Sequence, residues 1–254
     1  MSSRLELFNA LPRQGPGSDL ATASALAFAK YIPEHPRILD IGCGTGSQTL
    51  ALARLTGGRI TAVDISQAFL DTLARRAKNL GVASQVSTLR CSMDALDLPD
   101  DEFDLVWCEG AIYNVGFKRG LRALRRFLKP GGFLAVTELV WFTPDPPEPA
   151  LRFWSAAYPP ITTVDENVGY IEAAGYSLIH HFSLPASAWW DDYYGPLERQ
   201  IEKLRSRQWP ATEDLAFLDE NQEEIELYRS YSECYGYEFF VMQKPQDARV
   251  HDGS

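Results

Sequence analysis

The strongest constraint on this chain is a predicted strand that leads directly into a glycine-rich turn. Residues 38–46 have the sequence Ile-Leu-Asp-Ile-Gly-Cys-Gly-Thr-Gly, and a helical pattern follows them. Glycine lacks a Cβ atom, so the backbone can bend sharply at such a turn and a ligand can lie directly against it. Residues 37–41 are therefore predicted to form the first strand of an α/β sheet, with a ligand site at its carboxyl end.

Strand and helix patterns alternate along most of the chain. Further strands are predicted at residues 59–63, 85–90, 103–108, 133–140, 176–184 and 237–243, and helices at 19–31, 46–55, 66–80, 120–128 and 164–174. Residues 1–18 are expected to form a polar arm, residues 143–149 a rigid loop, and residues 189–231 two helices. This order predicts the α/β class: a Rossmann-like, seven-stranded, mostly parallel sheet with helices on both faces, plus a helical lid inserted before the last strand.

Charge and composition exclude several classes of function. The formal net charge is −10, which argues against nucleic acid as a partner because phosphate binding needs a basic face. No run of 18 apolar residues is present, so no membrane span is expected, and the first residues lack the apolar core of a signal peptide. The cysteines Cys43, Cys91, Cys108 and Cys234 form no CxxC pair. We therefore expect a cytoplasmic protein with free thiols and no metal site.

The residues around the turn favour S-adenosylmethionine (SAM) over a nicotinamide dinucleotide. Gly42, Gly44 and Gly46 form a GxGxG pattern, whereas a dinucleotide site expects a further glycine where Ser47 stands. Asp40, just before the turn, would repel a pyrophosphate but attract the amino group of a zwitterionic methionine moiety.

Two later segments are expected to complete the ligand site. Asp64 ends the second predicted strand, where a carboxylate can accept hydrogen bonds from both ribose hydroxyls, although it can also cap the next helix. Ile65 offers an apolar face for adenine or, alternatively, belongs to the core. In the run Cys91-Ser-Met-Asp94, the acid can accept the adenine amino group or cap a short helical turn.

From Ser92 to Val115 the sequence SMDALDLPDDEFDLVWCEGAIYNV resembles the third and fourth motif regions of class I SAM-dependent methyltransferases. Over residues 38–140 the chain is similar to the small-molecule branch that includes the ubiquinone/menaquinone C-methyltransferases, and residues 14–18, the EGAIYN run and residues 138–142 resemble an unassigned bacterial subset of it. The resemblance implies a small-molecule acceptor, with S-adenosylhomocysteine (SAH) as the second product. The residues expected to bind the cofactor are Gln14, Asp40, Gly42, Cys43, Gly44, Gly46, Asp64, Ile65, Ser92, Met93, Asp94 and Glu109.

We expect one domain over residues 1–254. Its expected parts are an N-terminal arm and helix (1–31), a SAM-binding core (32–142), an acceptor-side segment (143–235) with a helical lid at about 187–234, and a final strand (236–245).

Methyl transfer from a sulfonium mainly needs alignment of the reactants, and it needs a general base only where the acceptor must lose a proton. The candidate catalytic residues are Glu109 and Tyr113, which follow the fourth strand, and Glu138, near the carboxyl end of the fifth. His180 and His181 lie within a predicted strand and so point to opposite faces, where structural roles are expected.

Residues 141–235 differ in composition from the rest of the chain, with 17 acidic and 6 basic residues and 17 of the 30 aromatic ones. Most rings are expected to pack between lid and body, and a subset to line an acceptor pocket. Asp191 and Asp192 lie between four aromatic residues in an expected loop, which suits a cationic or amine acceptor, although a planar aromatic acceptor would also stack there. The competing explanation is that the acids, such as Glu220, Glu223, Glu224 and Glu226, form solvated helix faces.

Two alternative functions are considered. One is an NAD(P)-dependent oxidoreductase on a Rossmann fold, which Asp40 and Ser47 disfavour. The other is a SAM-binding module without turnover. The sequence does not distinguish methylation at N, O, C or S, nor the oligomeric state.

Overall fold

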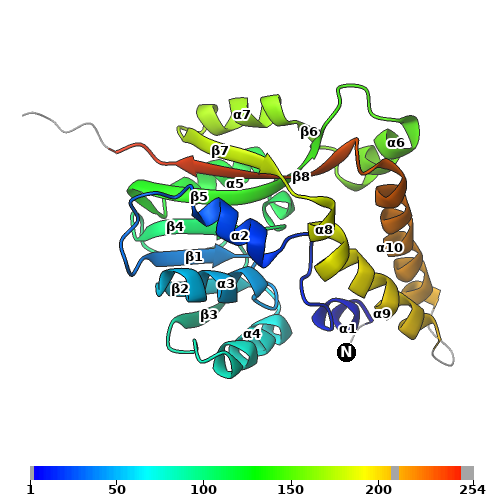
Figure 1. The fold of residues 1–254 in the computed structure, drawn as a ribbon, viewed down its shortest axis with the longest axis horizontal. Helices are drawn as coiled ribbons and strands as arrows, with labels where there is room; N and C mark the ends of the chain where they lie inside the picture. The colour runs from blue at the N-terminus through cyan, green and yellow to red at the C-terminus, as the bar shows by residue number, and fades with distance from the viewer. Residues whose placement is uncertain (1–2, 207–211, 247–254) are drawn as a thin grey trace, which may run out of the picture.

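The computed structural model describes residues 3–206 and 212–246. Its centre is a sheet in the order β3-β2-β1-β4-β5-β8-β7, in which β8 runs antiparallel to both of its neighbours (Figure 1). The strands are β1 (Arg37–Ile41), β2 (Arg59–Asp64), β3 (Val86–Arg90), β4 (Phe103–Cys108), β5 (Leu128–Trp141), β7 (Ser177–Ser183) and β8 (Tyr235–Gln243). The two-residue β6 (Thr162–Thr163) pairs with the end of β5. The predicted α/β class and the mostly parallel seven-stranded sheet are confirmed.

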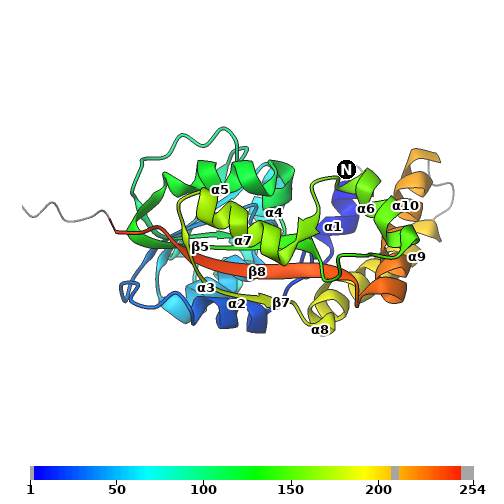
Figure 2. The same cartoon turned by 90° about the horizontal axis from the view of Figure 1, so that it is seen from above.

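Helices cover both faces of this sheet. They are α2 (Asp19–Leu26), α3 (Ser47–Thr56), α4 (Gln67–Asn79), α5 (Phe117–Arg125) and α7 (Val164–Ala173). Side chains of α2, α3 and α4 share one hydrophobic core, and those of α5 and α7 share the core on the other face. Figure 2 shows the two layers on either side of the sheet. Four of the five residues of β1 are buried, as expected for a central parallel strand that is covered on both faces.

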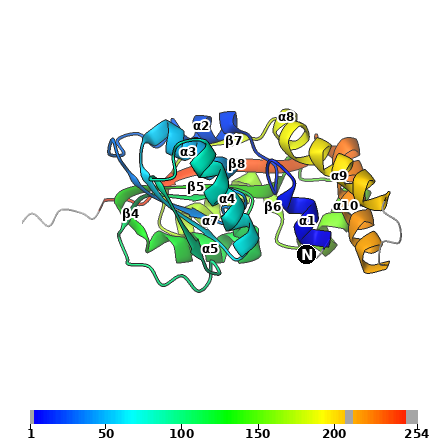
Figure 3. The same cartoon turned by 90° about the horizontal axis from the view of Figure 1, so that it is seen from below.

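The remaining helices gather beyond the carboxyl ends of the parallel strands (Figures 1 and 3). They are α1 (Ser3–Asn9), α6 (Glu148–Ala157), α8 (Ala186–Trp189), α9 (Gly195–Arg205) and α10 (Thr212–Tyr231), with the π-helical turn η2 (Trp190–Tyr194) between α8 and α9. Leu197, Ile201 and Ile225 are buried between them and extend the core. The predicted helical lid before the last strand is therefore present, and it lies over the edge where the glycine turn lies.

Several local predictions are wrong. The arm contains helix α1, whose Leu7 is fully buried, and helix α2 ends at Leu26 rather than at residue 31. The predicted loop 143–149 ends earlier than expected, because α6 begins at Glu148 with Pro149 in its first turn, where a missing backbone N–H costs nothing. Helix α5 begins at Phe117 rather than at residue 120.

Within the described residues, no helix is long and apolar enough to cross a membrane. In the same part of the chain, no group of three or more His, Cys, Asp or Glu side chains is placed to hold a metal ion.

Candidate functional site

The glycine turn has a backbone that other residues do not adopt readily. Gly42 has φ +69°, and a Cβ atom added there would lie 2.3 Å from Cβ of Ala111. Gly46, with φ +88°, directly precedes helix α3 and packs so closely that an added Cβ would lie 2.1 Å from Cδ1 of Leu73. The glycines therefore allow a left-handed turn and close approach of neighbouring elements at the same time.

A cavity of about 410 Å³ lies between this turn and the carboxyl ends of β2, β3 and β4, and we call it the loop cavity. Eight residues predicted to bind the cofactor line it: Gln14, Gly42, Gly44, Asp64, Ile65, Ser92, Met93 and Asp94. Tyr113 lines it as well, together with Val63, Phe69, Cys91, Gly110, Ala111, Asn114 and Val115. The structure thus brings together residues from five separate segments of the chain.

Asp64 lies at the wall of the loop cavity and also holds the turn in place. Its carboxylate accepts hydrogen bonds from the backbone N–H of Gly44 (2.9 Å) and of Ser66 (2.8 Å). Burial raises the pKa of the Asp64 carboxyl above its ordinary value. Ile65 beside it is 68% exposed, so its apolar side chain faces the cavity rather than the core.

Asp40 and Gly46 line neither the loop cavity nor the two further cavities described below. Asp40 is fully buried beneath the turn, where it accepts hydrogen bonds from Thr49 Oγ1 and from Gln48 Nε2. Desolvation raises the pKa of the Asp40 carboxyl to about 7. Its contact with a ligand would therefore run through Gln48, whose side chain lies between Asp40 and a narrow extension of the site.

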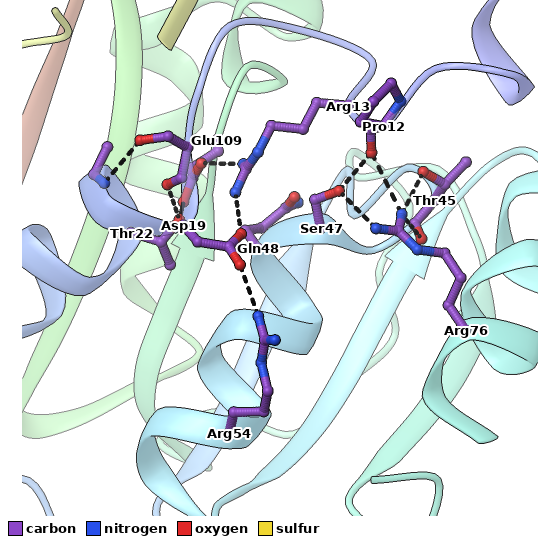
Figure 4. A network of polar contacts seen from close by, with 12 residues as sticks. Pro12, Arg13, Asp19, Thr22, Thr45, Ser47, Gln48, Arg54, Arg76 and Glu109 are labelled. Atoms are coloured by element: carbon purple, nitrogen blue, oxygen red, sulfur yellow. Dashed lines mark hydrogen bonds and ion pairs between the residues drawn. The ribbon is translucent and has the colours of Figure 1, made fainter. Parts of the chain in front are cut away.

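The N-terminal arm lies across the turn. Gln14 Oε1 accepts hydrogen bonds from the backbone N–H of Thr45 (2.8 Å) and from its hydroxyl (3.1 Å). Ser47 Oγ donates to the carbonyl of Pro12 at 2.5 Å, and Arg76 binds both Thr45 and Ser47 (Figure 4). The arm therefore occupies the backbone N–H of Thr45, directly before helix α3.

Glu109 is buried in a narrow pocket of about 50 Å³ that Cys43 and Gln48 also line. Its carboxylate accepts hydrogen bonds from Thr22 Oγ1 (2.7 Å) and Trp107 Nε1 (2.7 Å), and it forms an ion pair with Arg13 (3.1 Å; Figure 4). Three donors thus hold the Glu109 carboxylate in place.

A second cavity of about 230 Å³ lies under the lid, and we call it the lid cavity. Its lining residues are Gln14, Gly15, Pro16, Gly110, Tyr113, Thr137, Glu138, Leu139, Trp154, Ala157, Tyr158, Trp189, Tyr193, Glu224 and Tyr237. Gln14, Gly110 and Tyr113 line the loop cavity as well. The two cavities therefore adjoin at these three residues.

Glu138 is the most perturbed carboxyl of the lid cavity. Tyr158 Oη donates to its Oε1 at 2.5 Å, and among the described residues Oε2 has no hydrogen-bond partner although it is buried. Desolvation raises the pKa of the Glu138 carboxyl from about 4.5 to about 8. A buried acid with a pKa near neutrality is suited to accept or deliver a proton.

The acids of the lid divide between the cavity and the solvent. Glu220, Glu223 and Glu226 are exposed on α10, as the solvated-face explanation predicts, but Glu224 lines the cavity and accepts a hydrogen bond from Tyr194 Oη (2.8 Å). Asp191 and Asp192 do not line the lid cavity. The loop predicted for them is wrong, because they belong to the π-helical turn η2.

The two strand histidines lie away from both cavities. His180 stacks on Phe28 with ring centroids 3.8 Å apart, and His181 Nδ1 lies 2.5 Å from Glu238 Oε1. Both contacts fit the structural roles expected for them.

Sequence reasoning did not single out Arg13, Gln48, Gly110, Glu224 or Tyr237 as site residues, although each lines one of these cavities. Tyr237 could have been found from strand pairing, since it lies opposite Leu139 on β5. Glu224 and Arg13 carry no pattern that distinguishes them from neighbouring charges.

The raised pKa of Glu138 predicts a stability that falls with increasing pH. The folded protein keeps a proton on this carboxyl up to about pH 8, whereas the unfolded chain loses it near pH 4.5, so stability is lost as the pH rises between these values. One such group accounts for about 1.4 kcal/mol per pH unit. In Glu138→Gln the slope of unfolding free energy against pH, measured by urea denaturation from pH 5 to 9, should become shallower by about this amount. An identical slope in both proteins would contradict the assignment.

Comparison with known proteins gives a consistent result. Residues 38–132 match the family of methyltransferase domains. The chain is 35% identical over 122 residues to a ubiquinone/menaquinone biosynthesis C-methyltransferase of Pasteurella multocida, a match that covers 47% of this chain and 46% of that protein. The corresponding Escherichia coli protein is 36% identical over 104 residues, 40% of this chain and 41% of that one. The chain thus spans less than half the length of the curated relatives it matches.

Solved structures share the fold over almost the whole chain. A SAM-dependent methyltransferase from Geobacter sulfurreducens in complex with SAH has a TM-score of 0.81 at 24% identity and covers 94% of this chain and 96% of its own. A second one, from Thiobacillus denitrificans and also with SAH, has a TM-score of 0.72 at 24% identity, covering 87% and 90%.

Proposed function

We propose that this chain, which carries a class I SAM-dependent methyltransferase domain, transfers the methyl group of SAM to a small-molecule acceptor. The observation that carries this proposal is the junction of the two cavities at Gln14, Gly110 and Tyr113. A donor in one cavity and an acceptor in the other would meet there, and alignment of two reactants supplies much of the acceleration in such a displacement. We treat the described residues as one catalytic domain, since the arm, core and lid all contribute to the site.

The loop cavity fits SAM by the chemistry of its residues. Asp64 can accept the ribose hydroxyls, Ile65 and Met93 offer apolar contacts for adenine, and Asp94 can accept its amino group. The methionine end is assigned to the narrow pocket with Gly42, Gly44 and Glu109, where buried carboxyl oxygens attract an amino group. When bound, SAM supplies an activated methyl group on a sulfonium.

The same geometry disfavours the nicotinamide alternative. A dinucleotide places its pyrophosphate at the start of the helix after the turn, on free backbone N–H groups. Here Gln14 Oε1 accepts a hydrogen bond from the backbone N–H of Thr45, and Ser47 Oγ donates one to the carbonyl oxygen of Pro12 in the arm. The arm therefore takes the place that a pyrophosphate would need.

Among the candidate catalytic residues, Glu138 and Tyr113 have positions that suit contact with an acceptor. Glu138 faces the lid cavity with one oxygen atom unpaired, and Tyr113 stands at the junction. Burial raises the pKa of the Tyr113 hydroxyl, so this group is suited to orient a substrate rather than to lose its proton. We assign to Glu109 the positioning of the arm and of the cofactor's methionine end.

Asp64→Ala is expected to weaken SAH binding by about 1.5–3 kcal/mol, the scale of a hydrogen bond to a charged group, or roughly 10- to 150-fold in Kd. The physical reason is the loss of the ribose acceptor together with the support of Gly44. Titration calorimetry with SAH measures the effect, and we expect a wild-type Kd in the micromolar range, roughly −8 kcal/mol.

Asp71→Ala on the exposed face of α4 is the matched control, because Asp71 is exposed and its hydrogen bond from Gln67 is exposed as well. It should bind SAH like the wild type. An equal Kd in Asp64→Ala would remove Asp64 from the site, and NADH binding in place of SAH would contradict the proposed function. Release of SAH in the presence of an acceptor distinguishes the enzyme from a binding module without turnover.

A further inference from the structure

The lid cavity contains acids and aromatic rings but no base. Two of its 15 lining residues are glutamates, six carry aromatic rings, and none is Lys, Arg or His. A carboxylate or phosphate group in this cavity would meet two carboxyl groups and no basic side chain that could neutralise its charge. The composition of the wall therefore selects against an anionic acceptor.

Glu138 offers an unused hydrogen-bond acceptor to a ligand. Its side chain is 2% exposed, Tyr158 occupies Oε1, and no described residue donates to Oε2. A buried polar atom without a hydrogen-bond partner is unfavourable, and a polar hydrogen on the ligand would satisfy it. The unpaired Oε2 atom of Glu138 thus favours a ligand that carries an N–H or O–H group.

A second carboxyl and the rings favour positive charge on that ligand. Glu224 comes from α10, whereas Glu138 comes from β5, so the two acids reach the cavity from different elements. Trp154, Trp189 and Tyr193 also line the cavity, and aromatic rings attract cations, most strongly where the cation is desolvated.

We propose that the acceptor is a small amine, which the lid cavity holds as a cation between Glu138, Glu224 and the aromatic rings. This inference rests on the proposed methyl transfer. The cavity volume of about 230 Å³ is below the ~300–1,000 Å³ that is usual for drug-sized ligands, so the part of the acceptor that it holds is compact.

The chemistry balances without any further reactant. Binding of the ammonium group R–NH₃⁺ first displaces the Glu138 proton to water. The ammonium then gives one proton to the Glu138 carboxylate and becomes R–NH₂. Its lone pair forms the N–CH₃ bond while the S–CH₃ bond breaks, and the sulfur keeps the electron pair as the neutral thioether of SAH. The product is R–NH₂⁺–CH₃, and Glu138 is left protonated, as it was before binding.

Binding to the SAH-loaded protein tests the inference without a need for turnover. Benzylamine, cyclohexylamine and butylamine are each compared by calorimetry with the alcohol of the same shape, and benzylamine also with benzoate. We expect at least one amine to bind tenfold or more tightly than its alcohol, and benzoate not to bind. At pH 7 amine binding should also release a proton from Glu138, which a comparison of phosphate and Tris buffers detects. With SAM in place of SAH, mass spectrometry should find the N-methylated amine.

Variants then locate the binding site. Glu138→Gln and Glu224→Gln should each weaken amine binding at least tenfold with an unchanged Kd for SAH, which also reports that the fold is intact. Glu223→Gln, the exposed neighbour on α10, and the double variant Asp191→Asn/Asp192→Asn should bind the amine like the wild type.

The outcomes separate this inference from the proposed function. SAH binding without any preference for an amine over its alcohol overturns the inference alone, as does a preference that survives in both Glu138→Gln and Glu224→Gln. A wild-type protein that does not bind SAH contradicts the proposed function itself.

Discussion

Arg13→Ala is expected to lower the free energy of unfolding by about 3–5 kcal/mol, the usual cost of removing one partner of a buried ion pair. Arg13 and Glu109 have side chains only 5% and 4% exposed, and their charged atoms lie 3.1 Å apart. Without Arg13 the Glu109 carboxylate stays buried with Thr22 and Trp107 as its only protein donors. Urea denaturation measures the loss, and SAH binding should weaken as well because the arm that carries Gln14 loses its anchor.

Arg54→Ala is the matched control, since Arg54 pairs with the same Asp19 that also contacts Arg13 (Figure 4). Its ion pair is solvent-exposed, with side chains 47% and 58% accessible, and exposed pairs contribute roughly 0–1 kcal/mol. Equal losses in the two variants would show that burial of the Arg13–Glu109 pair does not determine its effect.

Gly42→Ala is expected to abolish measurable SAH binding and to destabilise the protein by about 2–5 kcal/mol. A left-handed backbone costs a residue with a Cβ roughly 1–2 kcal/mol, and overpacking of a tight contact adds roughly 1–3 kcal/mol. Both costs apply to Gly42, because its φ is +69° and an added Cβ would lie 2.3 Å from Cβ of Ala111. Ala111 has no flexible side chain that could move aside. Thermal unfolding and calorimetry with SAH measure the two effects.

Gly169→Ala on α7 serves as the comparison, because the same substitution meets open space there. Alanine in a helix interior should stabilise by about 0.5–1 kcal/mol relative to glycine. If Gly42→Ala bound SAH normally, the close packing of the turn would not be what shapes the site.

The strands were predictable because a buried strand needs a short run of mostly apolar residues, which can be recognised in the sequence. The predicted bounds of β1 and β4 match the structure at both ends, since each run is mostly apolar and a polar or glycine-containing segment bounds it. Helix α6 could not be predicted in the same way, because the prolines before it indicate a loop and only the position of Pro149 in the first turn makes a helix compatible with them.

The candidate site was predictable on the cofactor side and much less so on the acceptor side. The turn and Asp64 follow from local spacing along adjacent strands, which fixes their common edge. Glu224 depends on the rotation of a long helix, and adjacent residues on a helix point about 100° apart, so nothing local separates it from the exposed Glu223. The position of Arg13 depends on how the arm folds back over residues almost a hundred positions later in the chain.

The connection between β5 and β8 has an evolutionary consequence. The matched methyltransferase domain covers residues 38–132, whereas the walls of the lid cavity come almost entirely from the arm and from residues 137–237. Substitutions in those walls would therefore change the proposed acceptor cavity, while the loop cavity, lined by residues 42–115 and by Gln14, would keep most of its residues. A sequence match confined to residues 38–132 thus carries information on the proposed donor site and little on the acceptor.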